Sequence, residues 1–266
     1  MRVTSHSSAR LIFDRVLIAL AILALWEFAG RKFGVYWLSS PGKVAERGMD
    51  WIASGELFVQ SGYTLLAAFI GFLVGAVPGI ALPMALRRTP VIAAILDPYI
   101  VGGYALPKIA LIPLFIIWFG IGLSAKVALV SSLTFFLVYF NTQAGIRAID
   151  PRLIQMGEIL GGNTRRIARL VVWPAIVPYV FAGLRISLPF SIGATAVAEL
   201  LTSNRGLGYL IQVSATGFDA TGSFTALVAL TFIVAVANMA LDHAEMRFLN
   251  WRPVAFEDKR TEATPA

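Results

Sequence analysis

The fold class that this sequence predicts is an all-α integral membrane protein with about six transmembrane helices. Of its 266 residues 58% are hydrophobic and 14% are charged, and the mean hydropathy is +0.76. Apolar runs of roughly 18 residues or more are long enough to cross a bilayer as helices. A spanning β-barrel is not expected, because its strands would alternate in segments of about 10 residues and these runs are continuous. The six apolar runs are 12–30, 64–86, 96–119, 125–143, 176–200 and 224–246.

The basic residues predict the orientation of these helices. If both termini lie inside, fourteen of the 22 Lys and Arg residues fall in the inner tails and loops and six fall outside, while Lys108 and Arg185 lie within or beside apolar runs. This excess follows the positive-inside rule, so both termini are expected in the cytoplasm. Since the rule accounts for the net charge of +7, no nucleic-acid partner is needed, and membrane lipid is the expected surrounding.

The chain is expected to form a single membrane domain, 12–250, between an N-terminal tail, 1–11, and a charged C-terminal tail, 251–266. Arg10 and Arg15 lie before and at the start of the first run, as in a signal peptide, but Glu27 lies near its end and no small-residue cleavage site follows. We therefore expect this run to be retained as a helix. Glu27 is expected to pair with Arg31, four residues further on.

A basic, glycine-bent and amphipathic segment begins at Asp150, between the fourth and fifth apolar runs. Its arginines make it unfit for the lipid core; they are Arg152, Arg165, Arg166 and Arg169. Apolar side chains recur in it at helical spacing, so one face can pack against protein; they are Leu153, Ile154, Met156, Leu160, Ile167 and Leu170. We expect a cytoplasmic loop at about 147–174 that is presented to another protein.

Small residues mark one face of the second run. Gly71, Gly75 and Gly79 are spaced four apart, and small residues at this spacing let two helix backbones approach closely. Packing within the subunit is the first interpretation, and a dimer seam is the alternative.

Polar residues mark one face of the fifth run. Ser187, Ser191, Thr195 and Glu199 follow one another at intervals of four, and Pro189 lies among them. They are expected to line a translocation path, unless the hydroxyls bond carbonyls of their own helix. Glu199 is expected either to pair with Arg205 as a brace of the outer loop or to lie at the mouth of the path.

Lys108 lies inside the third run, beside Pro107. A lysine at this depth is costly unless it faces protein, water or a partner. It is expected to reach the inner headgroups, to cap a broken helix or to place a fixed positive charge beside an anion path.

Patterns that would indicate an enzyme or a metal site are missing from the sequence. It contains no GxxxxGK[ST] phosphate loop, no HExxH and no cysteine. The two histidines, His6 and His243, lie near opposite ends of the chain. We therefore expect no catalytic residue, no bound metal and an energy source outside this chain.

The segment 151–189 resembles the cytoplasmic loop of bacterial ABC importer permeases, whose signature runs EAA, three residues, Gly, nine residues, then Ile-x-Leu-Pro. Counted back from Pro174, the glycine falls on Gly161 and the triplet on Gln155–Met156–Gly157. Gln155 replaces the usual glutamate, and Glu158 comes three residues later. Four further segments are similar to the subfamily that serves sulfonates, taurine and nitrate: LPKIALIPLFIIWFGIG at 106–122, GLRISLP at 183–189, VAEL at 197–200 and GLGYLI at 206–211.

This resemblance implies a type I ABC importer permease fold, in which a bent cytoplasmic helix pair, the coupling helix, fits a cleft on a separate ATPase subunit. ATP and Mg²⁺ are then bound by that ATPase, and this chain needs no cofactor. The implied partners are two ABC ATPase subunits, an extracytoplasmic solute-binding protein and a second permease copy in a homodimer, and the implied location is the bacterial inner membrane. The implied ATPase-coupling residues are Gln155, Met156, Gly157, Glu158, Gly161, Gly162, Arg165, Arg166 and Pro174.

The function implied by the resemblance is the membrane-spanning subunit of an ATP-driven importer for a small solute. A sulfonate, taurine, nitrate or similar anion is expected, and pyrimidine precursors and other nitrogenous solutes stay open. The alternative is an autonomous ion-coupled carrier or channel, which would leave the basic segment without a role.

Overall fold

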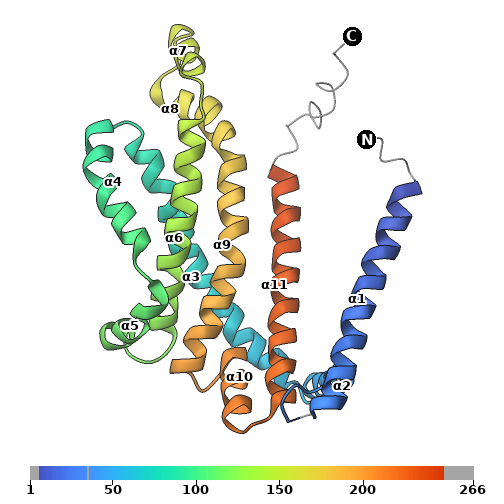
Figure 1. Cartoon of the computed structure of the whole chain (residues 1–266). Coiled ribbons are helices and arrows are strands. Elements are labelled where there is room, and N and C mark those ends of the chain that lie inside the picture. The colour runs from blue at the N-terminus through green and yellow to red at the C-terminus, as the bar shows by residue number, and fades with distance from the viewer. Residues whose placement is uncertain (1–5, 35, 249–266) are drawn as a thin grey trace. The chain divides into compact units, whose positions relative to one another are not determined.

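The computed structural model describes residues 6–34 and 36–248, and these are helical apart from short turns (Figure 1). No strand occurs among the described residues. The helices in chain order are α1 (His6–Phe33), α2 (Pro41–Ala53), α3 (Glu56–Leu86), α4 (Pro90–Ala105), η1 (Lys108–Leu111), α5 (Ile112–Phe119), α6 (Leu123–Arg147), α7 (Pro151–Ile159), α8 (Thr164–Ile167), η2 (Ala168–Val172), α9 (Trp173–Thr202), α10 (Leu207–Thr216) and α11 (Ala220–Phe248).

Four of the predicted runs lie in helices that are long and apolar enough to cross a membrane. These are α3, α6, α11 and the continuous stretch Thr164–Thr202. The third run is broken: the helices Pro90–Ala105 and Lys108–Phe119 meet at an angle of 83° and count as a fifth span only as a pair. The all-α prediction is confirmed, and the break follows Leu106, whose extended backbone precedes Pro107.

The first predicted run lies in α1, which has 28 residues but is not among the helices apolar enough to cross a membrane. Asp14, Arg15 and Glu27 lie within it, and each charge makes insertion costlier. The helix begins at His6, inside the stretch expected to be a tail. The predicted C-terminal tail, 251–266, lies outside the described residues.

Two compact units make up the chain, and α3, α6, α9 and α11 each contribute to both. Unit 1 contains the chain through Leu73, together with Pro107–Ser132 and Phe190–Val234. Unit 2 contains Val74–Leu106, Leu133–Pro189 and the described residues from Ala235 onward.

Unit 2 has a core that reaches into the basic segment. Ile149, Ile167, Val172, Ile176 and Val180 are buried together there. Because Ile167 and Val172 belong to α8 and η2, this core holds the basic segment to the adjoining ends of its neighbouring helices.

Gly71, Gly75 and Gly79 of α3 are buried. A Cβ atom at Gly71 would lie 2.6 Å from Cβ of Val130, and one at Gly79 would lie 2.9 Å from the carbonyl oxygen of Phe135. Both neighbours belong to α6. Glycine at 71 and 79 therefore permits close contact of α3 with α6 inside one chain, within unit 1 and unit 2 respectively.

Unit 1 buries the start of α10 in its core. Leu207, Leu210 and Ala226 are buried together, with Trp51 and Leu57 packed against them. The short helix α10 was not predicted from the sequence, and its first residues are held by α2, α3 and α11.

Candidate functional site

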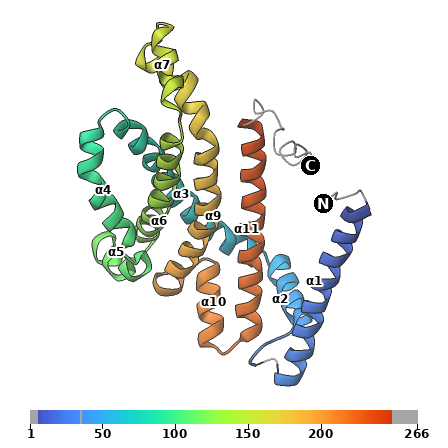
Figure 2. The same ribbon diagram turned by 45° about the horizontal axis from the view of Figure 1, so that its top comes forward.

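The basic segment folds as a helix–turn–helix between Arg147, where α6 ends, and Trp173, where α9 begins. Figure 1 shows α7 and α8 beyond these helix ends, and Figure 2 shows α7 there in a second view. The carboxylate of Asp150 accepts a hydrogen bond of 2.9 Å from the amide of Arg152, and Asn163 Oδ1 accepts one of 2.9 Å from the amide of Arg166. Side-chain caps of this kind satisfy amides that lack a partner in the first turn of a helix.

Glycines form the turn between α7 and α8. Gly161 has a φ of +74°, a conformation that side chains other than glycine rarely adopt. The amide of Gly162 donates a hydrogen bond of 2.9 Å to the carbonyl of Gly157, which closes the turn. The bend is therefore a property of the local sequence and not of packing against another part of the chain.

Most residues predicted to meet an ATPase are exposed on this segment. Gln155, Met156, Glu158, Arg165 and Arg166 are exposed, while Gly157, Gly162 and Pro174 are half-buried. Pro174 lies in the first turn of α9, and Gly161 lies exposed at the bend. The structure thus brings eight of the nine residues onto α7, α8 and their turn, with Pro174 at the base.

Charged and apolar side chains are exposed together on this segment. Ile159 and Leu160 are 84% and 82% exposed, and Leu170 is 63% exposed. None of the ion pairs among the described residues involves Arg152, Arg165, Arg166 or Arg169. The segment therefore offers a surface that is both apolar and cationic.

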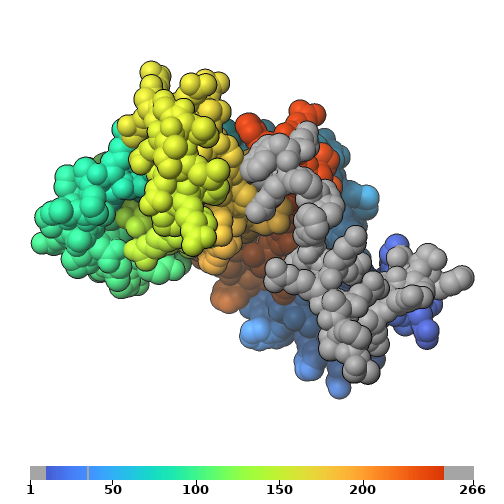
Figure 3. Space-filling view, turned by 90° about the horizontal axis from the view of Figure 1, so that it is seen from above, coloured from blue at the N-terminus to red at the C-terminus, as the bar shows by residue number. Residues whose placement is uncertain are grey.

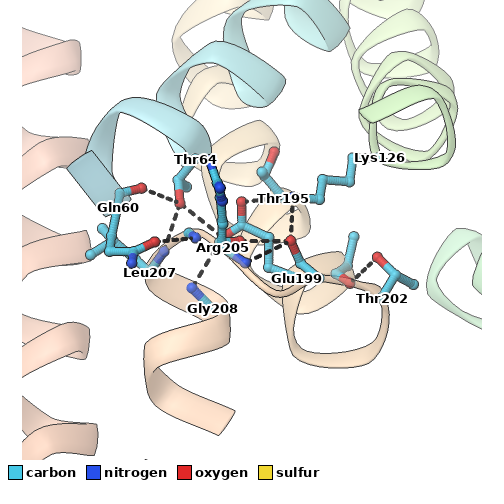
Figure 4. Close-up of polar contacts among 12 residues, drawn as sticks. Gln60, Thr64, Lys126, Thr195, Glu199, Thr202, Arg205, Leu207 and Gly208 are labelled. Carbon is cyan, nitrogen blue, oxygen red and sulfur yellow. Dashed lines mark hydrogen bonds and ion pairs between the residues drawn. The ribbon is translucent and has the colours of Figure 1, made fainter. Parts of the chain in front are cut away.

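A second polar centre lies in unit 1 around Glu199, near the end of α9 (Figure 4). The carboxylate is fully buried. Its Oε1 accepts from Nζ of Lys126 at 3.2 Å, and its Oε2 accepts from Oγ1 of Thr64 at 2.8 Å and from the amide of Gly208 at 3.1 Å. Lys126 also donates to Oγ of Ser203 at 3.0 Å. We call Thr64, Lys126, Glu199, Ser203 and Gly208 the Glu199 centre.

The loop that joins α9 to α10 is held against α3 beside this centre. The amide of Gly206 donates to Oε1 of Gln60 at 2.7 Å, and the amide of Leu207 donates to Oγ1 of Thr64 at 2.9 Å. Gly206 has a φ of +108°, and a Cβ atom there would overlap the carboxylate of Glu199. The loop therefore requires glycine at position 206 and side-chain acceptors on α3.

The predicted pairing of Glu199 with Arg205 is wrong. Arg205 instead donates a hydrogen bond to the hydroxyl of Tyr63 and lies with its guanidinium 5.0 Å from the centroid of that ring. The cation beside Glu199 is instead Lys126, which lies in the first turn of α6, since that helix begins at Leu123. A buried carboxylate is normally paired with a cation, and Lys126 provides that partner here. The predicted pair of Glu27 with Arg31 is confirmed, at 2.9 Å.

The polar line of α9 is buried. Ser187, Ser191 and Thr195 are at most 1% exposed, as is Glu199. Ser187 Oγ donates to the carbonyl of Leu184 at 3.2 Å, and Thr195 Oγ1 donates to the carbonyl of Ser191 at 2.9 Å. In this conformation, therefore, none of the four presents a surface to a solute.

Lys108 is the first residue of η1, directly after the break in the third run. It is 7% exposed. The side chain is thus enclosed by protein in this conformation.

Sequence reasoning assigned no partner to Arg185. Its Nη2 lies 2.6 Å from Oδ1 of Asp242 and 2.6 Å from Oε2 of Glu245, which join α9 to α11 in unit 2. The sequence feature that could have predicted this pairing is an arginine in an apolar run together with two acidic residues three apart on another helix.

In the described part of the chain, no group of three His, Cys, Asp or Glu residues could hold a metal ion.

The fold and these two sites define a class of protein, a multi-pass helical permease with an exposed basic loop. The family described as "Binding-protein-dependent transport system inner membrane component" matches residues 71–245. The chain belongs to this family and is the membrane permease of an ABC importer.

Individual relatives cover nearly the whole chain. The formylaminopyrimidine transport permease protein ThiX of Halalkalibacterium halodurans is 30% identical over 90% of this chain and 96% of its own length. The putative aliphatic sulfonates transport permease protein SsuC of Bacillus subtilis is 30% identical over 89% of this chain and 87% of its own length. A chain of the MetNI methionine ABC transporter matches with a TM-score of 0.58 at 22% identity, over 76% of this chain and 97% of that chain, and so supports the fold.

Proposed function

We propose that this chain conducts a small solute across the inner membrane of a bacterium, with both termini in the cytoplasm. Two copies form a homodimer with one path between them, and lipid surrounds the apolar helices. ATP and Mg²⁺ bind to separate ATPase subunits, and this chain holds no cofactor of its own. Family membership and the apolar helices support the proposal.

The docking of the ATPase at α7 and α8 is the central part of this proposal. The observation that supports it most strongly is the joint exposure of Leu160 and Leu170 with Arg165 and Arg166 on one short segment. Exposed apolar side chains bordered by charge are typical of a surface that meets another protein. Because α8 and η2 lead directly into α9, motion of a bound ATPase would reach a long helix without an intervening loop.

The proposed solute is a small anion such as a sulfonate, taurine or nitrate. The relative SsuC carries the name of aliphatic sulfonates, whereas ThiX, equally similar, carries the name of formylaminopyrimidine. A panel of sulfonates, nitrate and aminopyrimidines, titrated against the solute-binding protein that partners this permease, distinguishes the two classes. If the binding protein bound an aminopyrimidine tightly and none of the anions, the proposed solute would be that aminopyrimidine instead of an anion.

The proposed path includes Lys108 and the polar line of α9, formed by Ser187, Ser191, Thr195 and Glu199. Since these residues are buried in the conformation described, the proposal requires neighbouring helices to part during transport. A positive charge at Lys108 would then favour an anion.

Reconstitution tests the proposed function directly. Vesicles containing this chain, its ATPase and ATP inside, with the loaded binding protein outside, are expected to accumulate the solute. Omission of either ATP or the ATPase is expected to abolish uptake. Uptake by the permease alone, driven by an ion gradient, would support an autonomous carrier and contradict the proposal.

A further inference from the structure

An apolar hollow lies between the two arms of the helix–turn–helix in unit 2. Its volume is about 300 Å³. Its lining includes Leu160 at the end of α7, Leu170 and Val171 of η2, and Arg166 of α8. We call this space the α7–α8 hollow. Figure 3 looks onto this end of the chain and shows the yellow surface of α7 uncovered.

Two glycines, Gly157 and Gly162, line the hollow with backbone. A Cβ atom at Gly162 would lie 2.6 Å from the carbonyl oxygen of Gly157, and one at Gly157 would lie 3.2 Å from Cγ1 of Ile167. Ile167 is only 6% exposed and belongs to the core of unit 2. The hollow is therefore preformed, since part of its lining is glycine backbone and the Ile167 side chain is fixed in a core.

The size and composition of the hollow favour one kind of occupant. At about 300 Å³ it is at the lower limit of pockets that hold small molecules, roughly 300–1,000 Å³. Its exposed leucine walls favour an apolar group, and a preformed pocket admits one without loss of conformational entropy in the loop. Such pockets receive the anchoring side chains of protein partners.

The arginines around the hollow indicate which group of the partner lies beside the apolar group that enters it. Arg165, Arg166 and Arg169 lie on the arm that forms one wall, and none of them has an ion-pair partner among the described residues. A guanidinium is matched best by a carboxylate, which it binds through two parallel hydrogen bonds. The partner surface should therefore present an apolar side chain next to an acidic one.

We propose that the α7–α8 hollow receives a large apolar side chain of the partner ATPase, flanked by a carboxylate that binds Arg166. The proposal rests on the proposed function, in which this loop meets the ATPase, and adds the site and chemistry of the contact. In this arrangement the permease provides a pocket as well as a helix, and the partner provides a side chain that enters it.

A matched pair of substitutions tests this contact with the intact permease and its ATPase. Leu170→Asp places a charge in the wall of the hollow, and Ile159→Asp places the same charge on an exposed residue of α7 that does not line it. Leu170→Asp is expected to weaken the complex by about tenfold or more, as loss of an interface anchor does. Ile159→Asp is expected to weaken it by less than about threefold. Leu170→Met, which keeps an apolar wall, is expected to bind like the native chain.

Equal effects of the two charged variants, or a larger effect at Ile159, would overturn the proposal while leaving docking at this loop intact. Absence of any complex between the native chain and the ATPase would instead overturn the proposed function on which it rests. Elution of each variant as a single peak in detergent shows that a loss of binding is not a loss of folding.

Cross-linking identifies the occupant. The chain contains no cysteine, so a photoreactive probe attached to Leu170→Cys labels a single site. The expected product joins residue 170 to an apolar residue of the ATPase that has Asp or Glu as a neighbour on its surface. A product with lipid or with a second permease copy would overturn the proposal.

Discussion

The ammonium nitrogen of Lys126 lies 3.2 Å from Oε1 of Glu199, and the two side chains are 8% and 0% exposed. Taking two charges out of solvent is costly and is offset only where further hydrogen bonds satisfy both groups. Thr64, Ser203 and Gly208 complete those bonds. Within unit 1 this centre therefore joins α3, α6, α9 and the start of α10.

Removal of one partner of this pair is expected to be strongly destabilising. Glu199→Ala or Lys126→Ala leaves a buried charge without its counterpart, which costs about 3–5 kcal/mol. Thermal unfolding in detergent of the native chain, the two single variants and the double variant forms a double-mutant cycle. This cycle measures the coupling free energy between the two side chains. The double variant is expected to cost less than the sum of the two single variants, whereas strict additivity would show that the two charges do not interact.

The exposed pair Glu27–Arg31 provides the control. Its side chains are 32% and 78% exposed, and pairs in such surroundings contribute about 0–1 kcal/mol. Glu27→Ala should therefore change the unfolding temperature far less than Glu199→Ala. A comparable fall in unfolding temperature for Glu27→Ala and Glu199→Ala would contradict the claim that the buried pair contributes more stability than the exposed pair.

Glycine 208 is expected to be irreplaceable. A Cβ atom there would overlap the carbonyl oxygen of Ala196, whereas one at Gly193 on the same helix as Ala196 would meet nothing within 4 Å. Gly208→Ala should lower the yield of folded protein and solute uptake together. Gly193→Ala should be neutral or should stabilise α9 by up to about 1 kcal/mol. Normal uptake by Gly208→Ala would show that the loop can move away from α9 without loss.

Gly71 is expected to act through contact with α6. Alanine at 71 would place Cβ 2.6 Å from Cβ of Val130, a side chain that is 0% exposed and cannot move aside. Overpacking of this kind costs about 1–3 kcal/mol. Gly102→Ala on α4, where nothing lies within 4 Å, is the matched control. Unfolding temperatures that fall equally for both would contradict this account.

Opening of the path is expected to expose the polar line. Ser191 is 1% exposed, so Ser191→Cys in this cysteine-free chain should react slowly with a water-soluble thiol reagent in the resting permease. Trapping the ATPase with ATP, Mg²⁺ and vanadate should accelerate that reaction. Slow labelling in both states would exclude Ser191 from the path.

Periodic and compositional features of this chain were predictable from sequence, because they depend on local residue type. The apolar runs, the bend at Gly161 and the pair Glu27–Arg31 are of this kind. The partner of Glu199 was not, since Lys126 lies 73 residues away and only tertiary packing brings it near. Spacing also suggested that the hydroxyls of α9 face a path, whereas Thr195 is buried and bonded to its own helix.

Association of the permease with its ATPase tests the central claim, docking at α7 and α8, most directly. Gly161 and Gly55 have φ of +74° and +77°, and at each a Cβ atom would meet nothing within 4 Å. Tryptophan therefore imposes similar backbone strain at the two positions, but only Gly161 lies in the proposed docking segment. Co-purification should recover the ATPase with Gly55→Trp and lose it with Gly161→Trp. An undiminished complex with Gly161→Trp would contradict the claim.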